Sequence, residues 1–217
     1  MSNEYIIQKY GLDINTKRFG RLDIPNTDRG DLCHLFNELG YKVGAEIGVE
    51  RGRFSEQICL ANPLIELYGV DHYGNYGGKF GKNQEANYAE AQERLKQYDF
   101  RFVKKTSMEA LSEFADGSLD FVYIDGDHEF SHVACDIVEW TKKIRKGGIV
   151  SGHDYSHPQN RWNGNGELKK NVTHHVKEAV DGYMAGYRIE PWFVLGRTER
   201  RDGEKRELLR SWFFVKV

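Results

Sequence analysis

The sequence predicts an α/β fold, with a doubly wound, mostly parallel sheet of seven strands that ends in a C-terminal antiparallel hairpin. Short apolar runs alternate with longer segments of helical periodicity between residues 43 and 151, as in consecutive β-α-β units. Acidic residues follow several of these runs, and glycines interrupt the turn after the first one. Since 217 residues suit one such domain, we expect a single domain over 1–217.

The N-terminal section, residues 1–40, is expected to form a largely helical cap on the sheet. Its clearest helix extends from about Asp28 to Leu39, and Gly40 follows directly. Glycine is the residue type that most often stands just beyond the C-terminus of a helix. The first strand of the parallel sheet is therefore expected after Gly40.

The parallel part of the sheet is predicted from five apolar runs, each closed by turn-forming residues. The expected strands are 43–47, 65–70, 100–104, 119–124 and 149–151, and the expected helices between them are 54–61, 83–98, 108–114 and 130–144. Pro63 ends the first of these helices, and Gly147 with Gly148 ends the last. Strands that alternate with helices in this way pair in parallel.

The last part of the chain departs from this alternation. A polar segment, 156–175, is expected to be an insertion over the functional site, and a helix follows over about 173–183. Two β-rich runs, 192–195 and 208–217, flank a charged turn and predict an antiparallel hairpin. With the hairpin, the expected sheet has seven strands.

Composition argues against several classes of partner. Lys and Arg total 31 against 33 Asp and Glu, for a net charge of −2, so no overall field attracts nucleic acid or an anionic membrane. No apolar run approaches the roughly 20 residues that span a bilayer, and the first residues lack a basic and apolar leader. We expect a cytoplasmic protein that acts on a small molecule, and the sequence leaves open a homodimer.

The turn after the first predicted strand has features of a nucleoside site. Gly48 and Gly52 would let the backbone pass close to a ligand, and the helix that starts near Phe54 would direct its free N–H groups there. Asp71 ends the next strand, where an acid can accept hydrogen bonds from both ribose hydroxyls. A tight turn with nothing bound is the alternative interpretation of these glycines.

Acidic residues recur at or just beyond the carboxyl ends of the predicted strands. In open α/β sheets, ligands bind along that edge. We therefore expect one site that includes Glu46, Asp71, Asp125, Asp127 and Asp154.

Three segments together resemble the class I S-adenosylmethionine-dependent methyltransferases, most closely the small-molecule O-methyltransferase-like branch. They are residues 45–55 (AEIGVERGRFS), 123–128 (YIDGDH) and 147–155 (GGIVSGHDY). The likeness covers about Gly40 to Tyr155 and also fits the closing hairpin. It implies a Rossmann-like methyltransferase fold with S-adenosylmethionine (SAM) as cofactor. It further implies cofactor-binding roles for Glu46, Gly48 and Gly52 at the methionine part, Asp71 at the ribose, Ser107 and Met108 at the adenine, and Asp125 nearby.

The sequence is also similar to metal-dependent O-methyltransferases, which implies a candidate cation site. The resemblance assigns Asp125 and the two residues after the fifth strand, His153 and Asp154, as ligands of Mg²⁺ or another divalent cation. The usual pair is Asp-Asp or Asp-Asn, so His153 departs from the pattern and suits a transition metal better. With a metal, Asp127 is the candidate base; without one, His153 or His128 could accept the proton directly.

Other functions remain as alternatives. Residues 128–132 match His-Glu-x-x-His, the pattern of zinc peptidases, but they lie at the start of a predicted helix and Val138 stands where a third histidine would follow. A metal-dependent glycosyltransferase could use Asp125-Gly-Asp127 to bind a diphosphate, and a non-catalytic descendant would only bind ligands. No third glycine completes the NAD pattern after Gly48 and Gly52. We expect methyl transfer to oxygen on a small polar acceptor, such as a saccharide or secondary metabolite.

Overall fold

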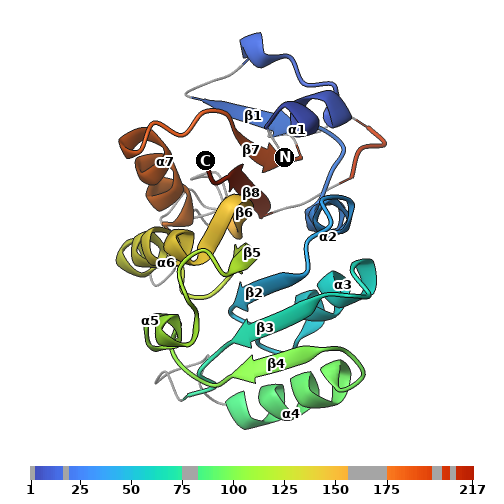
Figure 1. Ribbon diagram of the computed structural model, residues 1–217, viewed down its shortest axis with the longest axis vertical. Helices are drawn as coiled ribbons and strands as arrows, with labels where there is room; N and C mark the ends of the chain where they lie inside the picture. The colour runs from blue at the N-terminus through green and yellow to red at the C-terminus, as the bar shows by residue number, and fades with distance from the viewer. Residues whose placement is uncertain (1–2, 17–19, 75–82, 156–174, 197–201, 206–208) are drawn as a thin grey trace, which may run out of the picture.

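The computed structural model describes residues 3–16, 20–74, 83–155, 175–196, 202–205 and 209–217. One eight-stranded sheet runs through the molecule, and helices lie on both of its faces (Figure 1). The strands are β1 (Arg21–Ile24), β2 (Val43–Ile47), β3 (Glu66–Val70), β4 (Phe100–Val103), β5 (Leu119–Ile124), β6 (Ile144–Tyr155), β7 (Trp192–Leu195) and β8 (Arg210–Val215). Their order across the sheet is β1-β7-β8-β6-β5-β2-β3-β4.

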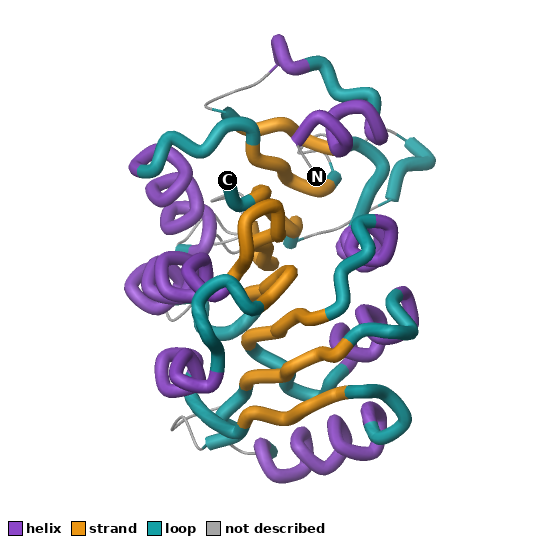
Figure 2. Tube along the Cα trace, in the orientation of Figure 1, coloured by secondary structure: helices purple, strands orange, loops and turns teal. Residues whose placement is uncertain are grey.

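The helices form two layers, which Figure 2 shows on opposite sides of the strands. One layer holds α1 (Asn3–Tyr10), α2 (Arg29–Glu38), α3 (Arg53–Ala61) and α4 (Gln84–Leu95), and the other holds α5 (Ser107–Ala110), α6 (Phe130–Lys143) and α7 (Val176–Gly186). Each layer encloses its own apolar core. Val133, Ile137 and Trp140 recur on one face of α6 and are almost completely buried against the sheet, as the helical repeat requires.

The doubly wound architecture and the hairpin are confirmed. All the pairings from β4 across to β6 are parallel, whereas β8 pairs antiparallel with both β6 and β7. The expected helix at 28–39 is α2, with Asp28 as its N-cap. The predicted insertion, 156–175, lies outside the described residues except for His175.

The expected count of seven strands is wrong, because β1 forms an eighth within the segment predicted as a helical cap. Leu22 and Ile24 are buried, while Arg21 and Asp23 on the other face are partly exposed. This strand pairs in parallel with β7. Only four alternating residues carried the signal, which is the lower limit for recognising a half-buried strand.

The parallel strands bring their carboxyl ends to one edge of the sheet. Ile47 at the end of β2 is level with Val70 of β3 and Ile124 of β5. The residues that follow these positions therefore gather at this edge. Among the described segments, no helix combines the length and the apolar character needed to cross a membrane.

Candidate active site

The glycine loop after β2 is shaped by contact with the neighbouring strand. Gly48 has φ +92°, and a Cβ there would lie 2.2 Å from the carbonyl oxygen of Asp125. Gly52 has φ +69°, and its Cβ would lie 2.7 Å from Cδ1 of Leu95. From the sequence, we expect both glycines to be needed because a ligand passes close to the backbone there. The backbone of the neighbouring segment already requires a glycine at position 48, and the positive φ favours one at position 52. Their cofactor-binding role stays a prediction.

Asp71, directly after β3, organises this loop. Its Oδ2 accepts the backbone N–H groups of Val49, at 3.2 Å, and Glu50, at 3.0 Å. Its Oδ1 accepts the N–H of Tyr73 at 2.9 Å. A carboxylate offers about four acceptor positions, so these bonds leave capacity for a ligand hydroxyl. The predicted ribose contact is compatible with this position and is not tested by it.

Glu46 is a buried carboxyl group at the centre of the site. Its side chain accepts a hydrogen bond from the hydroxyl of Ser55 on α3, and the residue is 2% exposed. Burial raises the pKa of Glu46 to about 8, against the opposing effects of Ser55 and the Arg29 charge. Glu46 therefore holds its proton at neutral pH, unless a positive charge arrives beside it.

Ser107 joins two helices. Its hydroxyl donates to the carboxylate of Asp136 and accepts the indole N–H of Trp140 at 2.7 Å. Burial raises the pKa of Asp136 to about 6, and the Ser107 hydrogen bond opposes that rise. Met108, the next residue, is 40% exposed. These contacts explain how α5 is held on α6, and the expected adenine contacts stay predictions.

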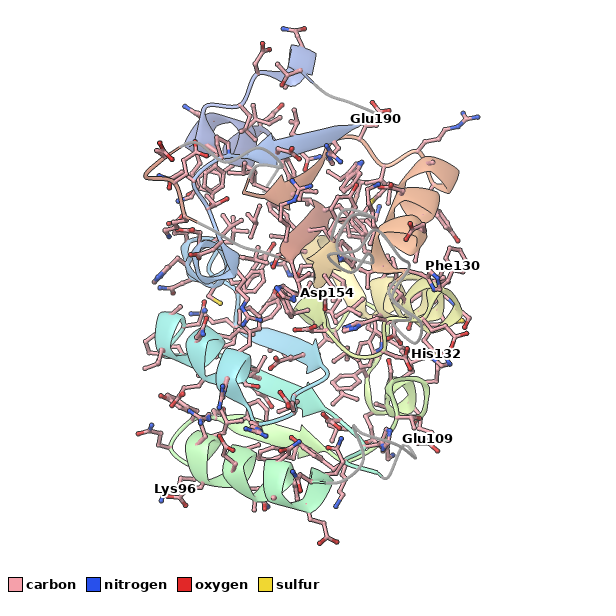
Figure 3. All side chains as sticks on the ribbon, turned by 180° about the vertical axis from the view of Figure 1, so that it is seen from behind. Lys96, Glu109, Phe130, His132, Asp154 and Glu190 are labelled. Carbon is pink, nitrogen blue, oxygen red and sulfur yellow. The ribbon has the colours of Figure 1, made fainter. Side chains whose placement is uncertain are left out.

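Two histidines and two aspartates meet at the carboxyl ends of β5 and β6. Nε2 of His128 lies 2.9 Å from Oδ2 of Asp154 and 3.9 Å from Oδ1 of Asp125. Nδ1 of His153 lies 3.5 Å from Asp154 and 3.8 Å from Asp125. Figure 3 labels Asp154 near the middle of the molecule, with His132 on the neighbouring helix α6. The predicted metal ligands are thus together, and His128 joins them.

The three residues whose potential metal-ligand atoms lie closest together differ by one residue from the three predicted metal ligands. Single ligand atoms of Asp125, His128 and Asp154 lie within 4.8 Å of one another. His128 thus takes the place that was expected for His153. A small cavity of about 10 Å³, room for about one water molecule, opens beside these residues, and Asp127, Val176 and Trp212 also line it.

A bulge in β6 directs Asp154 into this cavity. The register between β6 and β8 shifts between Gly152 and Tyr155, and Asp154 has φ +60°. The indole of Trp212 supports the bulge by donating to the carbonyl of His153 at 3.2 Å. Bulges re-aim side chains, and an unusual backbone angle in a non-glycine residue is often found at functional sites.

The surroundings of His128 and Asp125 shift the pKa of both groups upwards. Burial disfavours a charged His128, but hydrogen bonds and charges from Asp125 and Asp154 outweigh it and raise the pKa of His128 to about 10. Burial also raises the pKa of Asp125, against the effects of both histidines. At neutral pH, His128 is therefore an imidazolium held between two acids.

Most of the site lies within a segment that matches a known family. Residues 45–155, just over half of the chain, match the model of a family described as "Methyltransferase domain". The chain belongs to this methyltransferase family. The match contains the glycine loop, Asp71 and the His/Asp cluster. It confirms the resemblance inferred from the three sequence segments.

Among curated proteins, the chain is similar to an uncharacterized protein, y4gI, of Sinorhizobium fredii (strain NBRC 101917 / NGR234). The two are 27% identical over 121 residues, 52% of this chain. The chain spans only 12% of the length of that relative.

Several solved structures share the fold of this chain. A putative caffeoyl-CoA O-methyltransferase from Staphylococcus aureus has a TM-score of 0.58 at 15% identity, over 100% of this chain and 93% of that one. The O-methyltransferase from Bacillus cereus in complex with SAH has 0.57 at 14%, over 87% and 80%. A putative rRNA methylase from Clostridium thermocellum has 0.56 at 11%, over 88% and 98%. At these identities the likeness concerns the fold.

Among the described residues, the zinc-peptidase pattern does not form a zinc site. His128 precedes α6 and pairs with Asp154, whereas Nδ1 of His132 lies 3.0 Å from Oδ2 of Asp127. The two imidazoles serve different carboxylates. Burial alone would raise the pKa of Asp127. Hydrogen bonds from the Glu129 N–H and from His132 outweigh burial, so the pKa of Asp127 lies below its ordinary value. Asp127 is therefore ionised and engaged with α6.

Arg29 is a site residue that sequence reasoning missed. It is the first residue of α2, where the capping box of Asp28 and Asp31 fixes the start of the helix. Its guanidinium lies 4.9 Å from the centre of the Phe54 ring, and Nη1 lies 3.9 Å from Oδ2 of Asp125. In the sequence this residue belongs only to a helix start, far from the motifs, so no local signal indicated its role.

Proposed function

We propose that the protein transfers the methyl group of S-adenosylmethionine to a hydroxyl oxygen of a small polar acceptor. The observation that carries the proposal is the direct backbone contact between the glycine loop and the turn after β5, which bears Asp125 and His128 of the His/Asp cluster. A cofactor in the loop would therefore lie beside groups that bind and deprotonate a hydroxyl. The O-methyltransferases that share this fold support oxygen as the acceptor atom.

The residues of the loop suit the cofactor. When bound, SAM supplies an electrophilic methyl group on a positively charged sulfur. Asp71 has acceptor capacity for ribose hydroxyls, and Glu46 is placed to respond to a positive charge by losing its proton. The positive charge of Arg29 pairs with Asp125 and opposes the rise in the pKa of Glu46.

The acceptor side must orient a hydroxyl group and accept its proton. His128 is charged at neutral pH, so it orients the acceptor and stabilises the developing alkoxide. His153, which is 14% exposed in its side chain and near both acids, takes the proton in the metal-free reaction. Proton removal and alignment with the methyl group are the two tasks left to the protein in this reaction.

A divalent cation at Asp125, His128 and Asp154 is a second route to the same chemistry. Their ligand atoms are close enough to share one ion, and the imidazole favours Mn²⁺ or Zn²⁺ over Mg²⁺. His128 must lose its proton to bind metal. With a cation there, Asp127 becomes the base, as expected from the sequence. Calorimetry with Mn²⁺ in buffers of different ionisation enthalpy would detect release of that proton. Binding without proton release would exclude His128 as a ligand.

The first experiment is a calorimetric titration with S-adenosylhomocysteine, because it needs no acceptor. We expect one-to-one binding to the wild type and at least about tenfold weaker binding to Asp71→Ala, which loses ribose contacts. Asp99→Ala, an exposed aspartate on the loop before β4, is the control. If the folded wild type does not bind, the SAM proposal fails, and the glycosyltransferase and non-catalytic alternatives become preferred.

The second experiment locates the base. Small hydroxylated acceptors are screened with and without Mn²⁺, and an rRNA fragment is included because fold neighbours include a putative rRNA methylase. We expect turnover of a small acceptor only. His153→Gln should then lower kcat without metal, whereas Asp127→Asn should lower it with metal. Unchanged kcat in both variants would refute both base assignments.

A further inference from the structure

Three cationic side chains surround the aromatic ring of Tyr155. The guanidinium carbons of Arg21 and Arg210 lie 5.8 and 5.6 Å from the ring centre, and Nζ of Lys177 lies 5.2 Å from it. These residues belong to β1, β8 and α7, three elements far apart in the sequence. We call these four residues the Tyr155 cluster.

The neighbouring acids only partly neutralise this cluster. Asp23 lies 3.1 Å from Nε of Arg21 and 3.4 Å from Nη1 of Arg210. Asp181 accepts the Tyr155 hydroxyl at 2.7 Å and pairs with Lys177. Within the described parts of the chain, three cations against these two carboxylates leave one excess positive charge.

Arg210 is a buried cation of the cluster that pairs only loosely with its neighbouring acid. The residue is 6% exposed. Its Nη1 lies 3.4 Å from Oδ2 of Asp23 without hydrogen-bond geometry, and neither Nη1 nor Oδ1 of Asp23 makes a hydrogen bond to a residue in the described part of the chain. A buried guanidinium with an unused N–H is costly. Burial, together with the nearby charge of Arg21, lowers the pKa of Arg210. An added negative charge would relieve both costs.

The cluster is close in sequence to the residues that line the His/Asp cavity. Residues that line the cavity have close neighbours in the cluster: Asp154 precedes Tyr155, Val176 precedes Lys177, and Trp212 lies two residues from Arg210. Two residues along a strand span about 6.6 Å. Two of the three cations thus follow or precede cavity-lining residues by one or two positions, a separation comparable with the length of a small molecule.

We propose that the acceptor is an acid: a hydroxyl compound whose carboxylate, phosphate or sulfate group is bound by the Tyr155 cluster. The side chains of Arg21 and Lys177 are 20% and 22% exposed and can contact the anion, with Arg210 beneath them. The acceptor hydroxyl would then lie toward His128 and His153. This inference rests on the proposed function, and it narrows the acceptor from any small polar compound to an anionic one.

Titration of the full chain with inorganic phosphate, sulfate and acetate tests the proposal without knowledge of the acceptor. Chloride keeps the ionic strength constant, and backbone amide NMR shifts report binding. We expect saturable binding of at least one of the three anions, with the largest shifts near Tyr155. Lys177→Gln should weaken it about tenfold. Lys142→Gln removes a lysine from a comparable helix-surface pair with Glu139, at the far end of α6, and should leave binding unchanged.

Two results would overturn the proposal: no saturable binding of any of the three anions, or equal weakening by Lys177→Gln and Lys142→Gln. Binding of S-adenosylhomocysteine is measured in parallel and should be the same in wild type and Lys177→Gln. If the wild type binds the cofactor product but no anion, only the acidic acceptor is refuted. If it binds an anion but not S-adenosylhomocysteine, the methyltransferase proposal is refuted instead.

Discussion

Nε2 of His128 lies 2.9 Å from Oδ2 of Asp154, although one residue follows β5 and the other sits in the bulge of β6. The bulge and the positive φ of Asp154 bring its carboxylate to the imidazole. The charge of His128 therefore depends on the backbone geometry at the ends of β5 and β6, which places the two side chains side by side.

The His128 charge should make stability depend on pH. Its pKa is about 10 in the folded protein and about 6.5 when unfolded, so the stabilisation is complete below pH 6.5 and is lost as pH rises toward 10. Because the side chain is 36% exposed, we expect a term of only about 1 kcal/mol. Urea unfolding across this range should show it in the wild type and in His132→Gln, but not in His128→Gln. An unchanged pH profile in His128→Gln would refute the assignment.

Glu46 should also make the protein less stable as pH rises, but for a different reason. Its carboxyl group is neutral in the fold up to about pH 8, whereas in the unfolded chain it ionises near 4.5. Between these values the folded state binds more protons, so stability falls as pH rises, by about 5 kcal/mol. In Glu46→Gln, the amide keeps the Ser55 contact and this fall should disappear from chemical unfolding curves. A persistent fall would mean that another group is responsible.

Gly48→Ala should be strongly destabilising. The new Cβ would meet the Asp125 carbonyl at a backbone angle that alanine disfavours, and we expect a loss of about 3 kcal/mol or more in the free energy of unfolding. Gly40→Ala is the matched control, since Gly40 has φ +69° and no atom lies within 4 Å of the place that a Cβ would take. It should cost about 1 kcal/mol. Equal costs in urea melts would show that backbone strain, and not the contact with Asp125, dominates.

Removal of the Ser107 hydroxyl should destabilise the contact between α5 and α6. Ser107→Ala leaves the buried Asp136 carboxylate and the Trp140 indole without their shared partner, at a cost of about 2 kcal/mol. Ser112→Ala removes an exposed hydroxyl that bonds only the nearby Glu109 carbonyl and should change stability by less than about 0.5 kcal/mol. Thermal unfolding of both variants gives the comparison; similar values would mean that the Ser107 bonds contribute little.

The sequence predicted most of the fold because its parallel strands are mostly apolar runs with clear turn residues between them. The eighth strand, β1, was missed because two of its four residues are charged. This strand is stabilised by its pairing with β7. Because β7 lies near the other end of the chain, no local sequence pattern reveals that contact.

For the candidate site, strand ends correctly indicated where Asp71, Asp125 and Asp154 lie, since parallel strands place their ends at one edge; the roles of these residues stay predictions. They could not predict that His128 rather than His153 completes the compact ligand set, because that depends on the bulge in β6. Nor could they predict Arg29, whose reach to Asp125 depends on how α2 packs against the sheet.

The contact between Gly48 and the Asp125 carbonyl also bears on how such a protein could change its substrate. No side chain lies between the two backbone segments at that point. The spacing between the methyl donor and the acceptor-binding groups would then be set by main chain alone. Replacement of the residues around His153 or Tyr155 would alter which molecule is accepted while the distance over which the methyl group travels stays the same.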